Sequence, residues 1–411
     1  MRILEEESVG TTHVFHGGKS KEALRSAITE LRPTLSTRAE SVEAQRRVPV
    51  ESMDALREAG YFNVVKPKAY GGYEYGFSTL VDLNIELAKG CASTAWVAGL
   101  LAAHQWLLAS FPAQAQDDVW GSNPDALVCG SYAPVAKAEL AEGGYVLSGR
   151  WSFASGCENA QWAVCAAILP ADAGEGVSGP AFLLIPASDY AIEDTWHVVG
   201  LAGTGSKTLL LDSVIVPKHR VLAFASTTSG QTPGASLYAH NPDYSLPMLC
   251  TIPSCLASVA VGAAHGALDD YLQRVSHRVT RGAVAGAHNR MAEFPTIQLR
   301  VAEAAASVDA ARKILLSDLK ERELSAKEGA KVSIDERITS RRGQAFSVSL
   351  AIRAAEALNA STGGQGLDIS HPVQRAWRDV NAVGRHISMN WDTVGTMYGQ
   401  MALGLEPKGQ Y

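Results

Sequence analysis

Two changes of side-chain periodicity, near residues 126 and 236, constrain what this chain can fold into. Before the first change and after the second, apolar residues recur every three or four positions, which is typical of helices that bury one face. Between them, short β-branched and aromatic runs alternate with glycine, proline and aspartate, as in strands joined by turns. Because 411 residues exceed one ordinary core, we predict a multidomain α+β protein. The predicted domains are helical over residues 1–125, a small β-barrel over 126–235, and helical again over 236–411.

Start and stop signals give the individual elements. Ser20 fits as the N-cap of a first helix over Lys21–Arg32, which we expect Pro33 to end. The linker over residues 227–234 is the clearest domain boundary. The other predicted helices are Val50–Ala59, Ser78–Ser110, Ile252–Thr280, Pro295–Glu321, Asp335–Thr362 and Pro372–Leu403. The predicted strands are Ala126–Tyr132, Gly144–Phe153, Ala160–Leu169, Ala181–Ile185 and Lys207–Val216.

Composition excludes several classes of protein. The net charge of −6 argues against a nucleic-acid-binding protein, which normally carries a basic face. The six cysteines form no Cys-x-x-Cys pair, so we expect neither a disulfide framework nor a metal site, and a cytoplasmic location is the default. The acidic N-terminus lacks the apolar core of a secretory signal. The most apolar stretch, Leu246–Leu268, contains Pro253 and His265 and is predicted to be a buried helix rather than a membrane span.

The run Ser148–Gly156 carries the motif Trp-x-Phe-x-Ser-Gly. Trp151, Phe153 and Ser155 alternate with small residues, which predicts a strand with these three side chains on one face. Two aromatic side chains beside one hydroxyl would form an apolar wall with a single hydrogen-bonding group. Such a wall suits an aromatic ring system with a polar edge.

Three later segments complete a set of four motifs. Gly203–Lys207 offers a tight glycine turn with the hydroxyls of Thr204 and Ser206. The other two are Ala267–Arg278, and Thr362-Gly-Gly-Gln-Gly366 followed by Pro372–Asp379. In this order the four motifs resemble the acyl-CoA dehydrogenase superfamily. The Trp-x-Phe-x-Ser-Gly run is most similar to the two-component, reduced-flavin-dependent monooxygenases built on that fold.

The resemblance implies a helical domain, a β-domain and a C-terminal four-helix bundle in this order. It implies that Ser155 makes a hydrogen bond at flavin N5. It also implies that Arg278 binds a flavin phosphate, often across a subunit boundary, since the guanidinium fork matches a phosphate. The other flavin contacts that it implies are Trp151, Phe153, Thr204, Ser206 and, in the glycine turn, Gly364.

Acyl-CoA dehydrogenases need a carboxylate base, usually a glutamate. Neither family position for it, in Leu249–Ser254 or in Val383–Asp392, holds a matching glutamate here. The second stretch instead offers four residues at helical spacing, predicted to share one face: His386, Met389, Asn390 and Thr393. In the related monooxygenases a polar group of this region lies near the substrate, and His386 and Asn390 are both candidates for it.

His104 interrupts an otherwise apolar helix. A lone histidine on such a helix is more often a satisfied core residue. The resemblance instead implies that this helix lines the substrate pocket, so that His104 contacts the substrate or acts as a base there. It further implies substrate contacts from Ser131 and Tyr132 on the first strand, and from Met389 in the C-terminal region.

The implied activity is hydroxylation of a small aromatic compound through a flavin C4a-hydroperoxide, formed from O2 and FMNH2 or FADH2. No nicotinamide-binding fingerprint follows a strand, so a separate NAD(P)H:flavin reductase would supply the reduced flavin. The C-terminal stretch from Met389 onwards resembles that of indole and indole-3-acetate monooxygenases, which favours indole or indole-3-acetate as substrate. The fold also implies a homotetramer.

Two alternatives remain at this stage. One is an acyl-CoA dehydrogenase with an unrecognised base. The other is a non-catalytic flavin-binding scaffold of the same fold. Reaction with O2 in the presence of reduced flavin separates the oxygenase from both.

Overall fold

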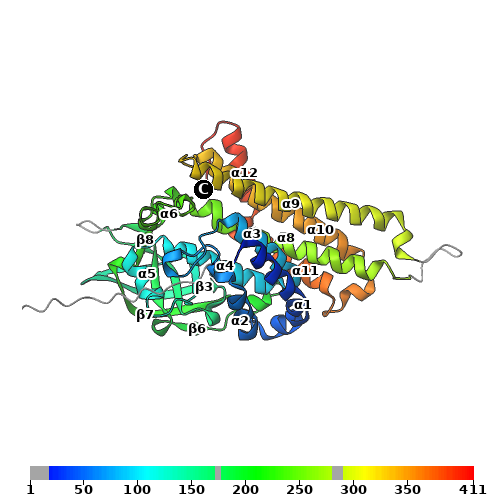
Figure 1. Ribbon diagram of the computed structural model, residues 1–411, viewed down its shortest axis with the longest axis horizontal. Helices are drawn as coiled ribbons and strands as arrows, with labels where there is room; N and C mark the ends of the chain where they lie inside the picture. Colours follow the sequence, from blue (N-terminus) through cyan, green and yellow to red (C-terminus); the bar gives the residue numbers. More distant parts are fainter. Residues whose placement is uncertain (1–17, 172–176, 280–289) are drawn as a thin grey trace, which may run out of the picture.

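The computed structural model describes residues 18–171, 177–279 and 290–411 (Figure 1). The end of the predicted helix Ile252–Thr280 lies outside these residues. A helical segment, a β-rich segment and a second helical segment follow one another, which confirms the α+β class and its order. The helices are α1 (Lys21–Gln45), α2 (Val50–Ala59), α3 (Phe77–Gly90), α4 (Ala92–Ala109), α5 (Ala113–Trp120), α6 (Phe224–Ser229), α7 (Pro233–Leu237), α8 (Met248–Val275), α9 (Pro295–Lys327), α10 (Ile334–Ala360), α11 (Pro372–Gly384) and α12 (Trp391–Ala402).

The first helix corrects the prediction that Pro33 ends it. Ser20 does cap α1, since its side chain accepts a hydrogen bond from the Ala23 N–H, but the helix continues through Pro33 to Gln45. Leu24, Leu35 and Val42 are all buried, so the apolar face continues past the proline. A proline costs one helical hydrogen bond and some bending, and the burial of this face outweighs that cost.

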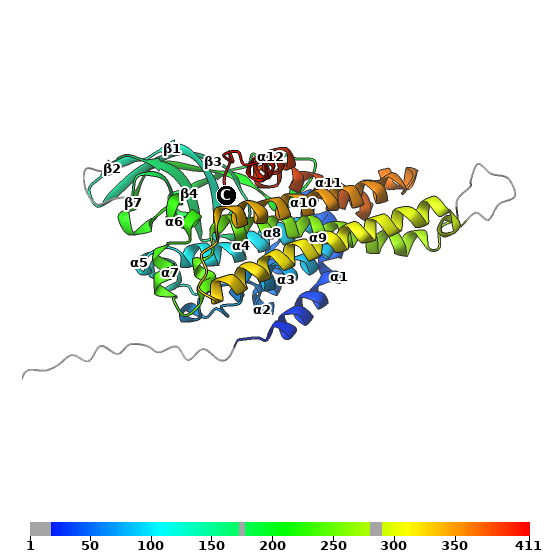
Figure 2. The same ribbon diagram turned by 90° about the horizontal axis from the view of Figure 1, so that it is seen from above.

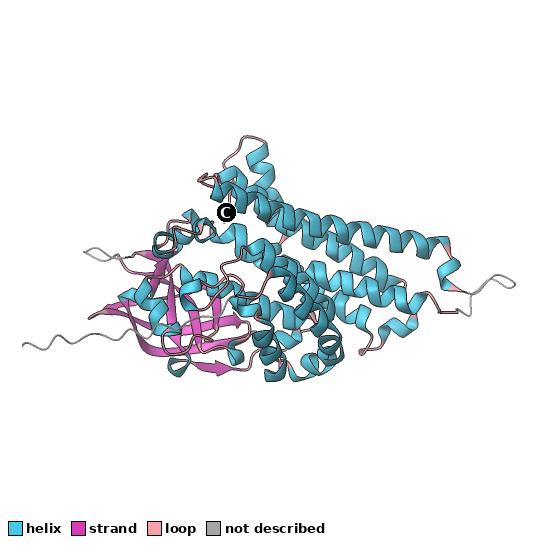
Figure 3. Ribbon diagram, in the orientation of Figure 1, coloured by secondary structure: helices cyan, strands magenta, loops and turns pink. Residues whose placement is uncertain are grey.

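The β-rich segment forms two four-stranded sheets, which differs from the single barrel that the strand spacing predicts. One sheet has the order β1-β4-β5-β8 and the other the order β2-β3-β7-β6, with β1 of the first packed against β3 of the second. The strands gather at one end of the molecule (Figure 3). They are β1 (Val128–Lys137), β2 (Glu139–Ala141), β3 (Gly144–Ala154), β4 (Trp162–Leu169), β5 (Gly179–Pro186), β6 (Ala191–Glu193), β7 (Lys207–Pro217) and β8 (Val221–Ala223).

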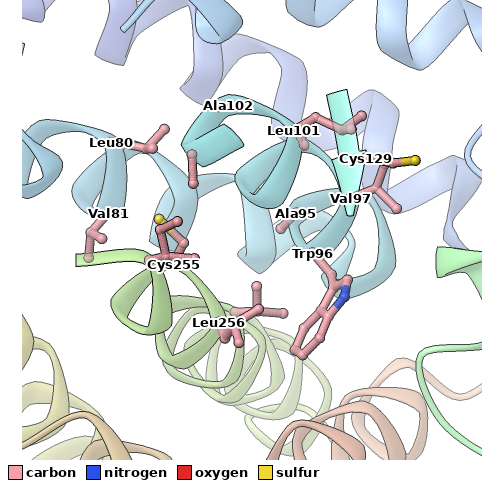
Figure 4. Packing of buried hydrophobic residues seen from close by; sticks show 14 of the residues in the cluster. Leu80, Val81, Ala95, Trp96, Val97, Leu101, Ala102, Cys129, Cys255 and Leu256 are labelled. Carbon is pink, nitrogen blue, oxygen red and sulfur yellow. The ribbon is translucent and has the colours of Figure 1, made fainter. Parts of the chain in front are cut away.

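Helices α8, α9, α10 and α11 lie side by side and extend away from the sheets (Figures 1 and 2). Helix α8 is long and apolar enough to cross a membrane, yet 89% of its most apolar window is buried inside the fold, as predicted for this stretch. Glycine lets it approach α3 closely, because a Cβ on Gly262 would lie 2.3 Å from the Ile85 carbonyl oxygen. Figure 4 shows the core here, where Leu256 of α8 packs near Trp96 of α4. This packing positions α4, which carries much of the site.

Candidate active site

Four hydroxyl and indole groups form a buried hydrogen-bond chain around Ser155. Trp96 Nε1 donates to Ser155 Oγ at 2.9 Å, and Ser155 Oγ lies 2.7 Å from Ser206 Oγ. Ser206 Oγ lies 2.7 Å from Thr204 Oγ1, which itself donates to the Leu201 carbonyl at 2.9 Å. The hydroxyl hydrogen of Thr204 is used in that bond, so Thr204 can only accept from Ser206. The hydrogen of Ser206 is then used as well, so Ser155 donates to Ser206. Ser155 Oγ is left with one free lone pair, so it can accept a hydrogen bond from a ligand N–H.

The same motif contains a correction. Trp151 and Phe153 do not share a face: Trp151 is 0% exposed and donates to the Ala166 carbonyl at 2.8 Å, whereas Phe153 is 71% exposed. The register with β7 shifts between Trp151 and Ala154, and Phe153 has a φ of 66°. A bulge inserts one residue into the strand and turns the next side chain to the other side. The predicted two-ring wall is therefore wrong, and Phe153 instead meets Trp196 edge-on at 6.0 Å between ring centroids.

His104 lies on α4 beside β1 and is buried. Its Nδ1 is 2.7 Å from the Val128 carbonyl oxygen, so Nδ1 carries the hydrogen and Nε2 is an acceptor. Burial lowers the pKa of His104 to about 4, and the ring is neutral at physiological pH. Among the described residues, Nε2 has no hydrogen-bond partner. The histidine therefore keeps an unused acceptor inside the fold, unlike a satisfied core histidine.

Ser131 and Tyr132 differ in what they leave available. Ser131 Oγ donates to the Ser152 carbonyl at 2.7 Å, which ties β1 to β3. The Tyr132 ring lies 5.6 Å from the His104 ring, and its hydroxyl has no partner among the described residues. The hydroxyl hydrogen of Ser131 is bonded to the protein backbone, whereas the hydroxyl of Tyr132 remains available to a ligand.

One face of α4 joins the Ser155 group to His104. Gly156, next to Ser155, packs so closely on α4 that a Cβ there would lie 2.7 Å from Val97 Cγ1 and 3.3 Å from Leu101 Cδ1. Val97, Leu101 and His104 follow at helical spacing, so they share this face. Both groups thus belong to one site along α4.

The C-terminal candidates do not share a helix face, which corrects the prediction. The predicted helix Pro372–Leu403 ends at Gly384, and a short 3₁₀ turn over Ile387–Met389 precedes α12. The Asn390 side chain accepts from the Thr393 N–H and so acts as the N-cap of α12. The His386 side chain caps the 3₁₀ turn, accepting from the Ser388 N–H. Side-chain capping competes with helix continuation, and that competition breaks the predicted periodicity.

The Ile387–Met389 turn still brings His386 to the Ser155 group. The His386 ring lies 5.7 Å from the Trp96 ring, and Trp96 is the donor to Ser155. Burial and the Arg341 guanidinium lower the pKa of His386 to about 4. Met389, the last residue of the turn, is buried. The sequence reading missed the roles of Trp96 and Arg341; the spacing of eight residues between Trp96 and His104 on one helix was the available signal for the first.

Arg278 lies beside the glycine turn that contains Gly364, at the other end of the helices. Arg278 Nη1 donates to the Thr362 carbonyl. Its Nη2 packs against Gly363, where a Cβ would lie only 3.1 Å from it. Gly363 has a φ of 68°, which glycine adopts freely. This end, after α8 and between α10 and α11, lies away from the sheets (Figures 1 and 2). Within one chain the predicted flavin contacts therefore form two separate groups.

The depressed pKa of His104 predicts a loss of stability in acid. Between pH 6.5 and about 4 the unfolded chain binds a proton on this ring that the folded chain does not. The free energy of unfolding therefore keeps its full value above pH 6.5 and decreases as the pH falls towards 4. We expect urea denaturation curves of His104→Asn, which keeps a donor near Nδ1, to depend less on pH in this range than those of the wild type. Equal slopes for both proteins would show that the His104 ring has the same pKa in the folded and in the unfolded chain.

Comparison with known proteins identifies the class. Residues 19–121 match the acyl-CoA dehydrogenase N-terminal domain and residues 254–391 its C-terminal domain. The chain is 67% identical over 377 residues to the oxygenase component of an FADH2-dependent resorcinol hydroxylase from Rhizobium sp. (strain MTP-10005), covering 91% of this chain and 92% of the relative. It is 27% identical to an indole-3-acetate monooxygenase of Pseudomonas putida, covering 90% of each chain. The crystal structure of the 3-HSA hydroxylase from Rhodococcus sp. RHA1 superimposes with a TM-score of 0.88 at 34% identity, covering 94% of this chain and 98% of that one.

The chain therefore belongs to the acyl-CoA dehydrogenase family. Within this family it is an oxidoreductase, the oxygenase component of a two-component flavin-dependent monooxygenase that uses reduced flavin. An oxygenase component of this kind works with a separate flavin reductase and an aromatic substrate. The missing dehydrogenase glutamate agrees with this class.

Proposed function

We propose that this chain hydroxylates resorcinol or a close dihydroxybenzene, using O2 and FADH2 from a separate NAD(P)H:flavin reductase. The balanced reaction converts resorcinol, O2 and FADH2 into a trihydroxybenzene, water and FAD. The observation that carries the proposal is the unpartnered, buried acceptor His104 Nε2, which can take a hydrogen bond from a substrate hydroxyl. The relative with 67% identity supports a phenolic substrate, whereas indole finds support only from a relative with 27% identity.

The residues around Ser155 fit a reduced flavin. When bound, the reduced flavin supplies the two electrons with which O2 is activated and split. Ser155 would accept the N5 hydrogen with its free lone pair, while Thr204 and Ser206 hold the orientation of its hydroxyl. Oxidised flavin has no N5–H to donate, so the chain matches the reduced form. The exposed ring of Phe153, held at a strained φ, would cover part of the flavin ring system.

The substrate would lie along α4, with His104 accepting a hydrogen bond from its hydroxyl. Such a bond raises electron density in the ring and prepares it for attack on an electrophilic oxygen. Of the two C-terminal candidates we favour His386, because it lies against Trp96 while Asn390 caps α12. Met389 and Ser131 would complete the pocket wall.

We also propose a cytoplasmic homotetramer in which two copies share each flavin. Arg278, after α8, and Gly364, between α10 and α11, lie at the end of the helices away from the sheets, whereas Ser155 directly follows β3, so a single extended FAD would meet them on a neighbouring copy. We further propose that the chain divides into three domains, at residues 1–125, 126–235 and 236–411, and that α8–α11 form a four-helix bundle.

Arg278→Ala is expected to weaken FADH2 binding at least tenfold, because it removes a charge-assisted contact to a phosphate. The resorcinol dissociation constant should not change. Arg274→Ala, an exposed arginine one turn earlier, is the matched control and should leave both constants unchanged. An equal loss of substrate binding in Arg278→Ala would show that the arginine only holds the glycine turn through Thr362.

The activity itself is tested by mixing the purified chain with FADH2, air-saturated buffer and resorcinol. Mass spectrometry should find one oxygen atom from labelled O2 in the product, and little H2O2 should accumulate. Indole, phenol and an acyl-CoA with bound FAD serve as comparison substrates. If every aromatic compound returns unmodified while H2O2 accumulates, the proposal is wrong. Bleaching of oxidised FAD by the acyl-CoA would instead indicate a dehydrogenase.

A further inference from the structure

Two buried polar atoms of neighbouring rings lack a partner in the part of the chain that the structure describes. They are His104 Nε2, on α4, and the Tyr132 hydroxyl, on β1. A buried polar group without a partner is costly, so such groups in a folded protein call for a ligand or an ordered water. Two of them on adjacent rings form a paired recognition site.

The chemistry of each atom is fixed by its surroundings. His104 Nδ1 donates to the Val128 carbonyl, so Nε2 can only accept. The Tyr132 ring packs edge-on against Phe182 at 4.9 Å. Burial raises the pKa of Tyr132, so its hydroxyl stays protonated and can both donate and accept. The pair therefore fits a ligand with one hydroxyl that donates to the histidine and a second oxygen that meets the tyrosine.

Glycine makes the two rings converge. A Cβ on Gly130, between Cys129 and Ser131, would lie 2.9 Å from Tyr132 Cε1 and 3.2 Å from His104 Cε1. The ring centroids are 5.6 Å apart and the planes are tilted by 40°. Two hydrogen-bonding atoms on separate, adjacent side chains suit two hydroxyls that diverge from one ring, as meta hydroxyls do. Ortho hydroxyls are close enough to bond to each other, and para hydroxyls point to opposite ends of the ring.

We propose that Tyr132 is a specificity-determining residue that, together with His104, recognises the two meta hydroxyls of a 1,3-dihydroxybenzene. This inference rests on the proposed function. His104 accepts from the first hydroxyl and Tyr132 hydrogen-bonds the second. In this ring the carbon that is ortho to one hydroxyl and not between the two is para to the other. Both hydroxyls therefore activate the same position for oxygen transfer.

The test is Tyr132→Phe, which deletes only the hydroxyl. The dissociation constants of resorcinol and of phenol are measured without flavin by equilibrium dialysis, and kcat/KM is measured with FADH2. We expect resorcinol to lose roughly 10- to 100-fold in both measurements, since the loss of one buried hydrogen bond has this size. Phenol, which lacks the second hydroxyl, should change by less than about twofold. Tyr271→Phe deletes another buried hydroxyl, on α8, that has no partner among the described residues, and it should change neither constant for either substrate.

The thermal midpoint of apo Tyr132→Phe should equal or exceed that of the wild type, because the variant removes an unsatisfied buried group. Unchanged resorcinol binding in this variant, or an equal loss for phenol, would overturn the role of Tyr132 while leaving the hydroxylase activity intact. Failure of the wild type to hydroxylate any dihydroxybenzene would instead overturn the proposed function.

Discussion

Trp151→Ala should lower the free energy of unfolding by about 3–5 kcal/mol, the usual cost of emptying a buried aromatic site. Trp151 is fully buried between the sheets, and its indole N–H is bonded to the Ala166 carbonyl. Phe153→Ala, two residues further on, should change stability by only about 0.5 kcal/mol, because the ring is 71% exposed. Urea denaturation of the two apo variants measures both values.

Flavin binding should show the reverse order. Phe153→Ala should raise the FADH2 dissociation constant several-fold, whereas Trp151→Phe, which retains most of the buried ring, should leave it near the wild-type value. If the loss of Phe153 destabilised the fold as much as the loss of Trp151, the bulge after Trp151 would be wrong and both rings would belong to the core. If it had no effect on flavin binding, the exposed ring would serve another purpose.

This pair of residues illustrates what the sequence could and could not predict. Alternation correctly predicted a strand over this run, and the structure adds that Ser155 is buried beside Ser206 and Thr204. It could not predict the bulge, because the shift depends on the pairing of β3 with β7, some fifty residues away along the chain. A period of two is a local signal, and register is set by the partner strand.

The helical regions show the same limit. The spacing predicted α2 to the residue, but it missed that burial carries α1 through Pro33. It joined α11 to α12 across His386 and Asn390, whose side chains end one element and begin the next. Histidine and asparagine side chains are both able to cap a helix, but the prediction placed both of them in a substrate pocket. The role of Trp96 was missed because it depends on the hydroxyl of Ser155, 59 residues further along the chain.

Ser155→Ala should uncouple the reaction. The substitution removes the acceptor that the chain presents to the N5 hydrogen, and the loss of a hydrogen bond to a polarised group costs about 1.5–3 kcal/mol. The ratio of H2O2 to hydroxylated product should therefore rise roughly ten- to a hundredfold. The two products are quantified in single-turnover mixtures of FADH2, O2 and resorcinol. The consumption of FADH2 should continue, because Ser155 does not supply electrons.

The neighbours of Ser155 provide the controls. Ser152→Ala changes an exposed serine on the same strand and should leave the ratio unchanged. Ser206→Ala removes the acceptor of the Ser155 hydrogen, so the hydroxyl of Ser155 becomes free to rotate and to present its hydrogen to N5 instead of its lone pair. We expect Ser206→Ala to raise the ratio by less than Ser155→Ala does, and a double variant to match Ser155→Ala alone, since Ser206 acts only through Ser155. Additive effects of the two substitutions would mean that Ser206 contacts the flavin directly and that the orientation of Ser155 is set elsewhere.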